Sequence, residues 1–152
     1  MPKLKDVILV SIQLFLMLAF FLNVKWFLID VLVHFVWFYV GLAGVALSTI
    51  ALLQMNVHLS PFPTPKSDSK LITTGVFKFC RHPIYSGILI FMFSFSFWLG
   101  EGFKLFISFL LLVLFYYKST YEEKMLKAVF PNYEAYSSKT GRFLPKFRKL
   151  TS

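Results

Sequence analysis

Four long apolar runs separated by polar segments constrain the fold of this chain more than any other feature. They cover about residues 7–24, 35–55, 83–99 and 103–117, and only one charged side chain interrupts them. At a rise of about 1.5 Å per residue, the first run forms a helix roughly 27 Å long, close to the thickness of a bilayer's hydrocarbon core. The runs therefore predict an all-α integral membrane bundle of four transmembrane helices, built as a single domain by residues 1–152.

Composition supports a membrane environment. Hydrophobic residues make up 57% of the chain and aromatic residues 20%, whereas only 15% are charged, compared with about a quarter in soluble domains. The net charge of +9 would favour nucleic acid in a soluble protein, but no basic face is interleaved with aromatic residues as base stacking requires. We therefore expect no nucleic-acid partner. The single Cys and three His, at unrelated spacings, predict no metal site.

The distribution of Lys and Arg predicts the orientation. Fourteen of the 16 basic residues fall before the first run, in a central loop at residues 56–82, or in a tail at residues 118–152. Only Lys25 and Lys104 fall on the other side. By the positive-inside rule, both termini and the central loop are cytoplasmic, which means an inner-membrane protein if the chain is bacterial, and membrane lipids are expected partners.

Several finer features follow from residue type. Gly41 and Gly44 would allow close approach of a neighbouring helix. Residues 100–102 predict a tight turn that makes the last two spans an antiparallel hairpin. Five residues suited to anchoring or snorkelling at the membrane interfaces are Trp98, Lys104, Tyr116, Tyr117 and Lys118.

Beyond the last span, the pattern changes. Residues 121–130 predict a cytoplasmic amphipathic helix ended by Pro131, and residues 133–138 a further turn. The rest of the tail, to Lys149, is expected to be irregular and to lie against the membrane surface.

Two cytoplasmic segments carry more polar chemistry than anchoring requires. In the first, Pro83 suits the first position of a helix, whose free N–H groups would form a partly positive pocket mouth with Arg81 and His82. Tyr85 would add a ring and a hydroxyl, and Gly87 room for close approach. The alternative is a simple interfacial anchor.

The second segment is the adjacent pair Glu122 and Glu123, just after the last span. Neighbouring side chains on a helix diverge by about 100°, so the two carboxylates cannot both face one ligand atom. One could contact a ligand while the other meets a cation. The alternative is a solvated helix face on which Glu123 pairs with Lys127.

Together these segments resemble the isoprenylcysteine carboxyl methyltransferase family of membrane enzymes and its phospholipid methyltransferase relatives. The resemblance rests on five ordered pieces: a proline-containing lead-in, the "L-x-T-x-G-x-[YF]-x-x-x-R-[HN]-P-x-Y-x-G" signature, a paired-glutamate motif, and two pieces of a "Y-x-x-Y … R-[FY]-x-P" tail. They are Pro61–Pro65, Leu71–Gly87, Glu122–Leu126, Phe130–Tyr136 and Gly141–Pro145.

The resemblance implies transfer of a methyl group from S-adenosylmethionine to a lipophilic acceptor, a carboxylate or a lipid headgroup, that enters from the bilayer. It implies Arg142 and Glu123 as catalytic residues, the first orienting a carboxylate and the second serving as one of two candidate bases for an amine. The cofactor-binding residues that it implies are His82, Pro83, Tyr85, Gly87, Glu122, Glu123, Tyr133 and Tyr136.

Two other functions fit the sequence. Pro131-Asn132-Tyr133 is similar to an element in membrane reductases of the sterol-reductase type, which use NADPH, although this chain is short for that class. A non-enzymatic membrane scaffold would retain the fold without the chemistry. Binding of S-adenosylmethionine, of NADPH or of neither separates the three.

Overall fold

The computed structural model describes residues 3–24, 26–28, 34–55 and 71–146, and all regular elements in these ranges are helical. The proline-containing lead-in at residues 61–65 lies outside the described residues. The elements in chain order are α1 (Leu4–Phe20), α2 (Val36–Met55), the 3₁₀ turn η3 (Gly75–Lys78), α3 (Pro83–Leu99), α4 (Gly102–Val129) and α5 (Tyr133–Lys139).

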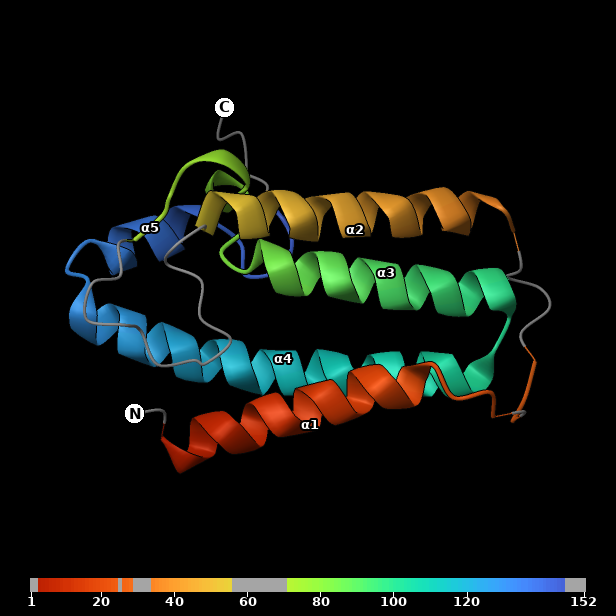
Figure 1. The fold of residues 1–152 in the computed structure, drawn as a ribbon. Helices are drawn as coiled ribbons and strands as arrows, with labels where there is room; N and C mark the ends of the chain where they lie inside the picture. The colour runs from red at the N-terminus through yellow and green to blue at the C-terminus, as the bar shows by residue number, and fades with distance from the viewer. Residues whose placement is uncertain (1–2, 25, 29–33, 56–70, 147–152) are drawn as a thin grey trace.

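The four long helices run alongside one another in alternating directions (Figure 1). In packing order, α2 contacts α3, α3 contacts α4, and α4 contacts α1. The start of α1, the end of α2, the start of α3, the end of α4 and all of α5 therefore lie at one end of the bundle (Figure 1). We call this the α5 end. The predicted hairpin is confirmed: Gly100 ends α3 with φ 67°, a left-handed conformation that glycine adopts without strain.

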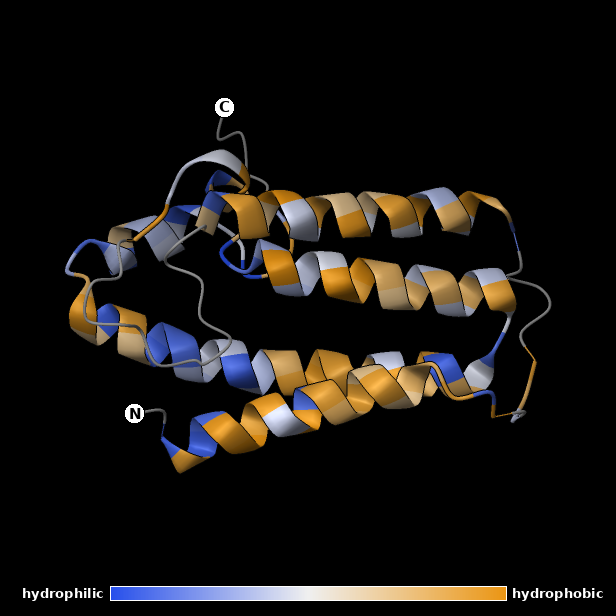
Figure 2. Cartoon of the chain, viewed as in Figure 1, coloured by the Kyte–Doolittle hydropathy of each residue, from blue (hydrophilic) through white to orange (hydrophobic). Residues whose placement is uncertain are grey.

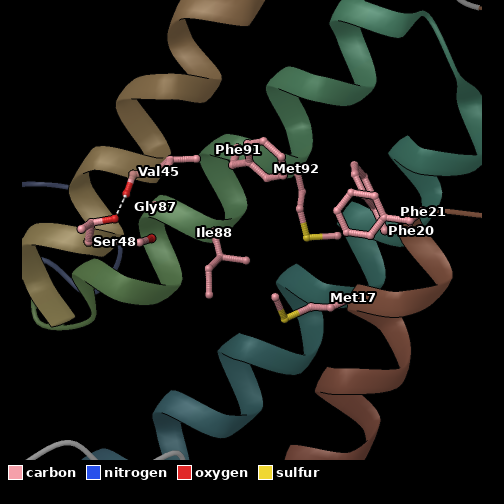
Figure 3. Close-up of a pocket in the computed structure, with 10 residues that line it drawn as sticks. Met17, Phe20, Phe21, Val45, Ser48, Gly87, Ile88, Phe91 and Met92 are labelled. Carbon is pink, nitrogen blue, oxygen red and sulfur yellow. Dashed lines mark hydrogen bonds between the residues drawn. The ribbon is translucent and has the colours of Figure 1, made fainter.

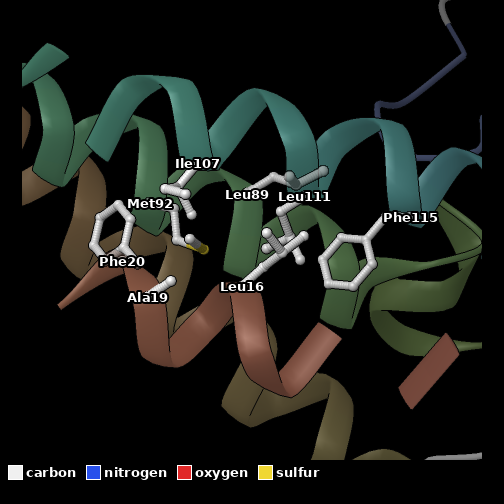
Figure 4. Close-up of a cluster of buried hydrophobic side chains, with 8 residues drawn as sticks. All are labelled: Leu16, Ala19, Phe20, Leu89, Met92, Ile107, Leu111 and Phe115. Carbon is white, nitrogen blue, oxygen red and sulfur yellow. The ribbon is translucent and has the colours of Figure 1, made fainter. Parts of the chain in front are cut away.

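The core lies between α1, α3 and α4 (Figure 4). For helices surrounded by lipid, close van der Waals packing of large apolar side chains is what favours helix association. The buried members are Leu16, Ala19, Phe20, Leu89, Met92, Ile107, Leu111 and Phe115.

Much of the outer surface is apolar, as Figure 2 shows along the helices, and the polar residues are concentrated at the α5 end. Leu18 of α1 is 72% exposed and Leu53 of α2 is 73% exposed. Among the described residues, α2 and α4 are long and apolar enough to cross a membrane, and α3 is a shorter apolar helix. These helices fit a membrane protein; the four-span count stays a prediction.

The expected close approach of a neighbouring helix is confirmed at Gly44 but not at Gly41, where an added Cβ would meet its nearest neighbour at 3.6 Å, an ordinary contact. A Cβ atom on Gly44 would lie 2.6 Å from the Gly87 carbonyl oxygen, and one on Gly87 would lie 2.3 Å from the Gly44 carbonyl oxygen. Both distances are far below van der Waals contact, so α2 and α3 pack backbone to backbone at this point.

Three expectations about boundaries and burial are corrected. The first helix spans residues 4–20 and not 7–24, because the Lys3 N–H bonds the Asp6 carboxylate at its start and the chain turns at Phe21. The last span and the amphipathic helix are one continuous helix, α4, since no proline or glycine separates them.

Lys104 and Lys118 do not snorkel: they are 5% and 1% exposed. Lys104 Nζ bonds the carbonyl oxygens of Phe20 and Leu22 at the end of α1, at 3.1 and 3.3 Å, where helix carbonyls have no intrahelical partner. Lys118 Nζ bonds Gln13 Oε1, also on α1, at 2.6 Å. Both lysines are thus drawn inward by polar groups of the neighbouring helix.

Candidate functional site

The start of α3 is formed by its own sequence and by residues 133–146, which comprise α5 and the segment after it and are called the tail from here on. Pro83 occupies the first turn, as predicted, because its missing N–H costs nothing there, and His82 is the N-cap residue. The backbone N–H groups of Arg81 and His82 donate to the carbonyl oxygens of Gly141 and Arg142 at 2.9 and 3.1 Å. The tail therefore pairs with the α3 start; residues 141–146 are irregular as predicted, and their position against the membrane surface stays a prediction.

The two adjacent glutamates meet at His82. Glu122 Oε2 lies 3.3 Å from His82 Nδ1, and Glu123 Oε1 lies 3.1 Å from His82 Nε2. The carboxylates diverge as expected for neighbours on a helix, and each reaches a different nitrogen of the same ring. The imidazole thus joins α3 to α4 over a sequence separation of about 40 residues.

Glu123 forms ion pairs with both arginines of the site. Its Oε1 accepts a hydrogen bond from Arg81 Nε at 2.9 Å, and its Oε2 lies 3.3 Å from Arg142 Nη2. Its side chain is 10% exposed. The alternative pairing with Lys127 is wrong, because Lys127 pairs with Glu134 on α5 at 3.4 Å.

Glu122 has fewer partners. Besides His82, its carboxylate accepts a hydrogen bond from the Tyr85 hydroxyl at 2.5 Å. The Tyr85 ring stacks between two others: its centroid is 4.3 Å from that of Phe115 and 5.5 Å from that of His82. Of the roughly four lone-pair positions on a carboxylate, Glu122 therefore uses two with these residues.

The charge state of His82 follows from these contacts. Burial disfavours the imidazolium, but the hydrogen bonds and negative charges of Glu122 and Glu123 outweigh it, so the pKa of His82 is raised above its ordinary value. With Arg81 and Arg142 also present, the site holds up to three positive and two negative charges.

Arg81 and Arg142 hold the tail in different ways. Arg81 Nη1 donates to the carbonyl oxygens of Ser137, at 3.0 Å, and Thr140. Arg142 Nη1 donates to Thr120 Oγ1 at 2.7 Å, and its guanidinium lies 4.7 Å from the centroid of the Tyr116 ring. Arg142 remains 25% exposed and keeps donors that these contacts do not use.

Two tyrosines of α5 border the cluster. The Tyr136 hydroxyl donates to the Phe77 carbonyl oxygen at 2.6 Å, and burial raises the pKa of Tyr136 to about 12. Tyr133 is 1% exposed, and its hydroxyl makes no hydrogen bond with the described residues. Burial and the charge of Glu123 raise the pKa of Tyr133 further, so its hydroxyl keeps its proton and offers a buried donor.

The structure brings together most residues singled out from the sequence. His82, Tyr85, Glu122, Glu123 and Arg142 form one contact network, which we call the His82 cluster. Pro83 begins the helix beneath it, and Tyr133 and Tyr136 lie beside it on α5.

Gly87 lies outside the His82 cluster. It faces α2 and lines an apolar pocket of about 170 Å³ between α1, α2 and α3. Figure 3 shows Met17, Ile88 and Met92 projecting into the space between these helices. The pocket is nevertheless close to the cluster in sequence, since Gly87 follows Tyr85 by two residues.

The sequence patterns do not single out two residues of the site. Arg81 enters them only as a neighbour of His82, yet it binds both Glu123 and the tail. Lys118 fits the pattern of an interfacial anchor, although it precedes Glu122 by four residues, the spacing that puts two side chains on one helix face.

Among the described residues, no group of His, Cys, Asp and Glu side chains could hold a metal ion. A search of curated protein sequences finds no match to this chain. A family model matches residues 29–133, which include α2, α3, α4 and the first residue of α5, and its description is phospholipid methyltransferase.

Proposed function

Because the chain belongs to the phospholipid methyltransferase family, we propose that it transfers a methyl group from S-adenosylmethionine to a lipophilic acceptor at a membrane. The observation that carries this proposal is the His82 cluster, in which the start of α3, the acidic couple of α4 and the tail meet at one end of an apolar bundle. A polar site bordered by lipid-facing helices is what a reaction between a charged cofactor and a membrane-dissolved acceptor requires.

The donor set fits the cofactor. S-adenosylmethionine carries an ammonium group, a carboxylate, ribose hydroxyls and a positively charged sulfur. Glu122 has acceptor positions left for the hydroxyl and ammonium groups. The buried Tyr133 hydroxyl, without a partner among the described residues, is a donor that a bound molecule can satisfy.

The two glutamates therefore receive different roles. Glu123, bound to Arg81, His82 and Arg142, holds the α3 start and the tail in place. Glu122 contacts the cofactor. When bound, the cofactor would supply an electrophilic methyl group attached to its positively charged sulfur. The protein's contribution is then to hold both reactants in line and to exclude water.

The acceptor is recognised by charge and by an apolar tail. Arg142 keeps free N–H donors and partial exposure, so it can orient an anionic carboxylate or lipid headgroup. A carboxylate acceptor needs no base. For an amine acceptor, Glu122 is the better base of the couple, since three cationic partners stabilise the charge of Glu123.

The apolar pocket suits part of the acceptor's hydrocarbon. A cavity of about 150 Å³ with apolar walls can hold a benzene molecule, so the pocket between α1, α2 and α3 admits a segment of comparable size. Gly87 lines it one turn or less from Tyr85 on α3, and this proximity to the His82 cluster supports the pocket as the site of the acceptor's tail.

The membrane arrangement follows the charge distribution. We propose that α1, α2, α3 and the apolar part of α4 cross the bilayer, and that the His82 cluster lies at the cytoplasmic face with both termini. The gathering of the α1 start, the α3 start and α5 at one end supports this orientation (Figure 1).

Titration calorimetry on the purified full chain in detergent tests the proposal. S-adenosylhomocysteine is expected to bind in the micromolar range, NADPH is not, and Glu122→Gln weakens binding. Glu134→Gln, a change to a 79% exposed glutamate on α5, is the matched control and leaves binding unchanged. Binding of NADPH alone would favour the reductase reading, and binding of neither would favour a scaffold.

Lipid mass spectrometry on membranes with and without the protein then searches for the acceptor. The expected change is a lipid whose mass increases by the replacement of one hydrogen with methyl, absent when the Glu122→Gln variant is expressed.

A further inference from the structure

Helix α1 lies outside residues 29–133, the segment that matches the family, yet it is bound to the candidate site. Its apolar face packs on α4 through Leu16 and Phe20 (Figure 4). At each end of this seam, a buried lysine of α4 reaches a polar group of α1: Lys104 at the end of α1 and Lys118 at Gln13, near its middle. The two lysines are alike in burial and in the helix they bind, but only Lys118 lies near the His82 cluster.

Lys118 is enclosed by groups from three helices. Its Nζ donates to Gln13 Oε1 of α1 at 2.6 Å and lies 5.3 Å from the centroid of the Tyr85 ring of α3. Burial lowers the pKa of Lys118, and the charges of Glu122 of α4 and of the fully buried Asp6 of α1 oppose this shift. At 1% exposure, this ammonium is held in one place by the protein.

Tyr85 connects Lys118 to Glu122 of the His82 cluster. The Tyr85 ring that Lys118 approaches carries the hydroxyl that donates to Glu122, and Glu122 pairs with His82. A buried cation held near that carboxylate adds a positive charge to the environment of His82, and charges interact strongly where water is excluded.

We propose that Lys118 is a positioning residue of the site, and that α1 belongs to the site because Asp6 and Gln13 hold the Lys118 ammonium beside Tyr85 and one turn from Glu122. Lys118 does not contact the reactants: it acts through Tyr85 and Glu122. The role assigned to these two residues rests on the proposed function, whereas the electrostatic coupling to His82 does not.

Nuclear magnetic resonance titration of histidine side chains in the full chain tests the coupling without any ligand, and His82→Asn identifies the His82 signal. The charged and titratable groups that face His82 are Glu122 and Glu123 of α4, Arg81, Tyr85 of α3 and Arg142 of the tail. Lys118→Met removes one more positive charge from this environment, so the midpoint of His82 should rise by about half a pH unit.

Three further variants complete the test. Lys118→Arg keeps the charge and should restore the midpoint toward that of the native chain. Gln13→Leu keeps the lysine but removes its anchor on α1, and should shift the midpoint in the same direction as Lys118→Met by a smaller amount. Lys104→Met, the matched control, breaks the other end of the same seam and should leave the midpoint unchanged.

Equal shifts in Lys118→Met and Lys104→Met, or no shift in Lys118→Met, would overturn the proposal. If Lys118→Met does not fold, Gln13→Leu and Lys118→Arg decide it. Calorimetry with S-adenosylhomocysteine adds the functional readout: about a tenfold loss of affinity in Lys118→Met and none in Lys104→Met. If the native chain does not bind S-adenosylhomocysteine, the proposed function fails while the titration still judges the role of Lys118.

Discussion

Arg81 and Glu123, 42 residues apart in the chain, form an ion pair in which Nε donates to Oε1 at 2.9 Å. The same guanidinium donates through Nη1 to the carbonyl oxygens of Ser137 and Thr140. One planar group thus joins the α3 start, α4 and the tail, and an ammonium cannot reproduce this geometry.

The Arg81→Lys variant should keep its attraction to Glu123 but release the tail, losing about 1.5–3 kcal/mol for each bond from a charged donor. Trypsin should then cut after Lys139 faster than in the native chain. Lys127→Arg, which changes an exposed pair between α4 and α5, is the control. Equal cleavage rates in the native chain and Arg81→Lys would show that the tail is held by other contacts.

Glu123→Gln and Glu122→Gln should differ in their effect on stability. The first leaves the cations Arg81 and Arg142 without their counter-charge in a site that is mostly shielded from water, at a cost of about 3–5 kcal/mol. The second removes the charge from a carboxylate with two hydrogen-bonding partners and should cost about 1–2 kcal/mol. Thermal unfolding in detergent measures both, and equal losses would contradict the division of roles between the two glutamates.

A methyl group at Gly87 should separate α2 from α3. Its Cβ would lie 2.2 Å from Ser48 Oγ and 2.3 Å from the Gly44 carbonyl oxygen, so Gly87→Ala should lose about 1–3 kcal/mol or more through overpacking. Gly41→Ala is the matched control, because its Cβ would meet its nearest neighbour at 3.6 Å, an ordinary contact. Thermal unfolding of both variants checks the prediction, which fails if Gly87→Ala is as stable as Gly41→Ala.

The stability of the native chain should fall as the pH rises above neutrality. The pKa of His82 is raised in the folded state by Glu122 and Glu123, although burial opposes the rise. A group with a raised pKa contributes its full stabilisation below the unfolded value of about 6.5 and loses it as the pH passes through the folded value. Unfolding temperatures measured between about pH 6 and about pH 9 should therefore decline more steeply in the native chain than in His82→Asn. Parallel curves would mean that His82 is neutral in the folded protein.

Much of the fold could be predicted because its signals are local. Residues 35–55 and 83–99 match α2 and α3 almost residue for residue, since long apolar runs bounded by Pro83 and Gly100 leave few other possibilities. The residues of the site were harder to predict from the sequence. His82, Tyr85 and the glutamates stand out by their polar chemistry beside the apolar runs and by motif resemblance, whereas the three partners of Glu123 cannot be predicted from spacing.

By itself, the sequence determined that the chain is helical and apolar, where α2 and α3 begin and end, and which segments carry polar chemistry. These properties depend on the period of the apolar residues and on backbone restrictions at proline and glycine, which act within a few residues. Only the tertiary structure decided that Lys104 and Lys118 turn inward, that the tail covers the α3 start, and that His82 lies between two carboxylates. Those outcomes arise because a buried charge must find partners, and the partners come from helices that meet only after the chain has folded.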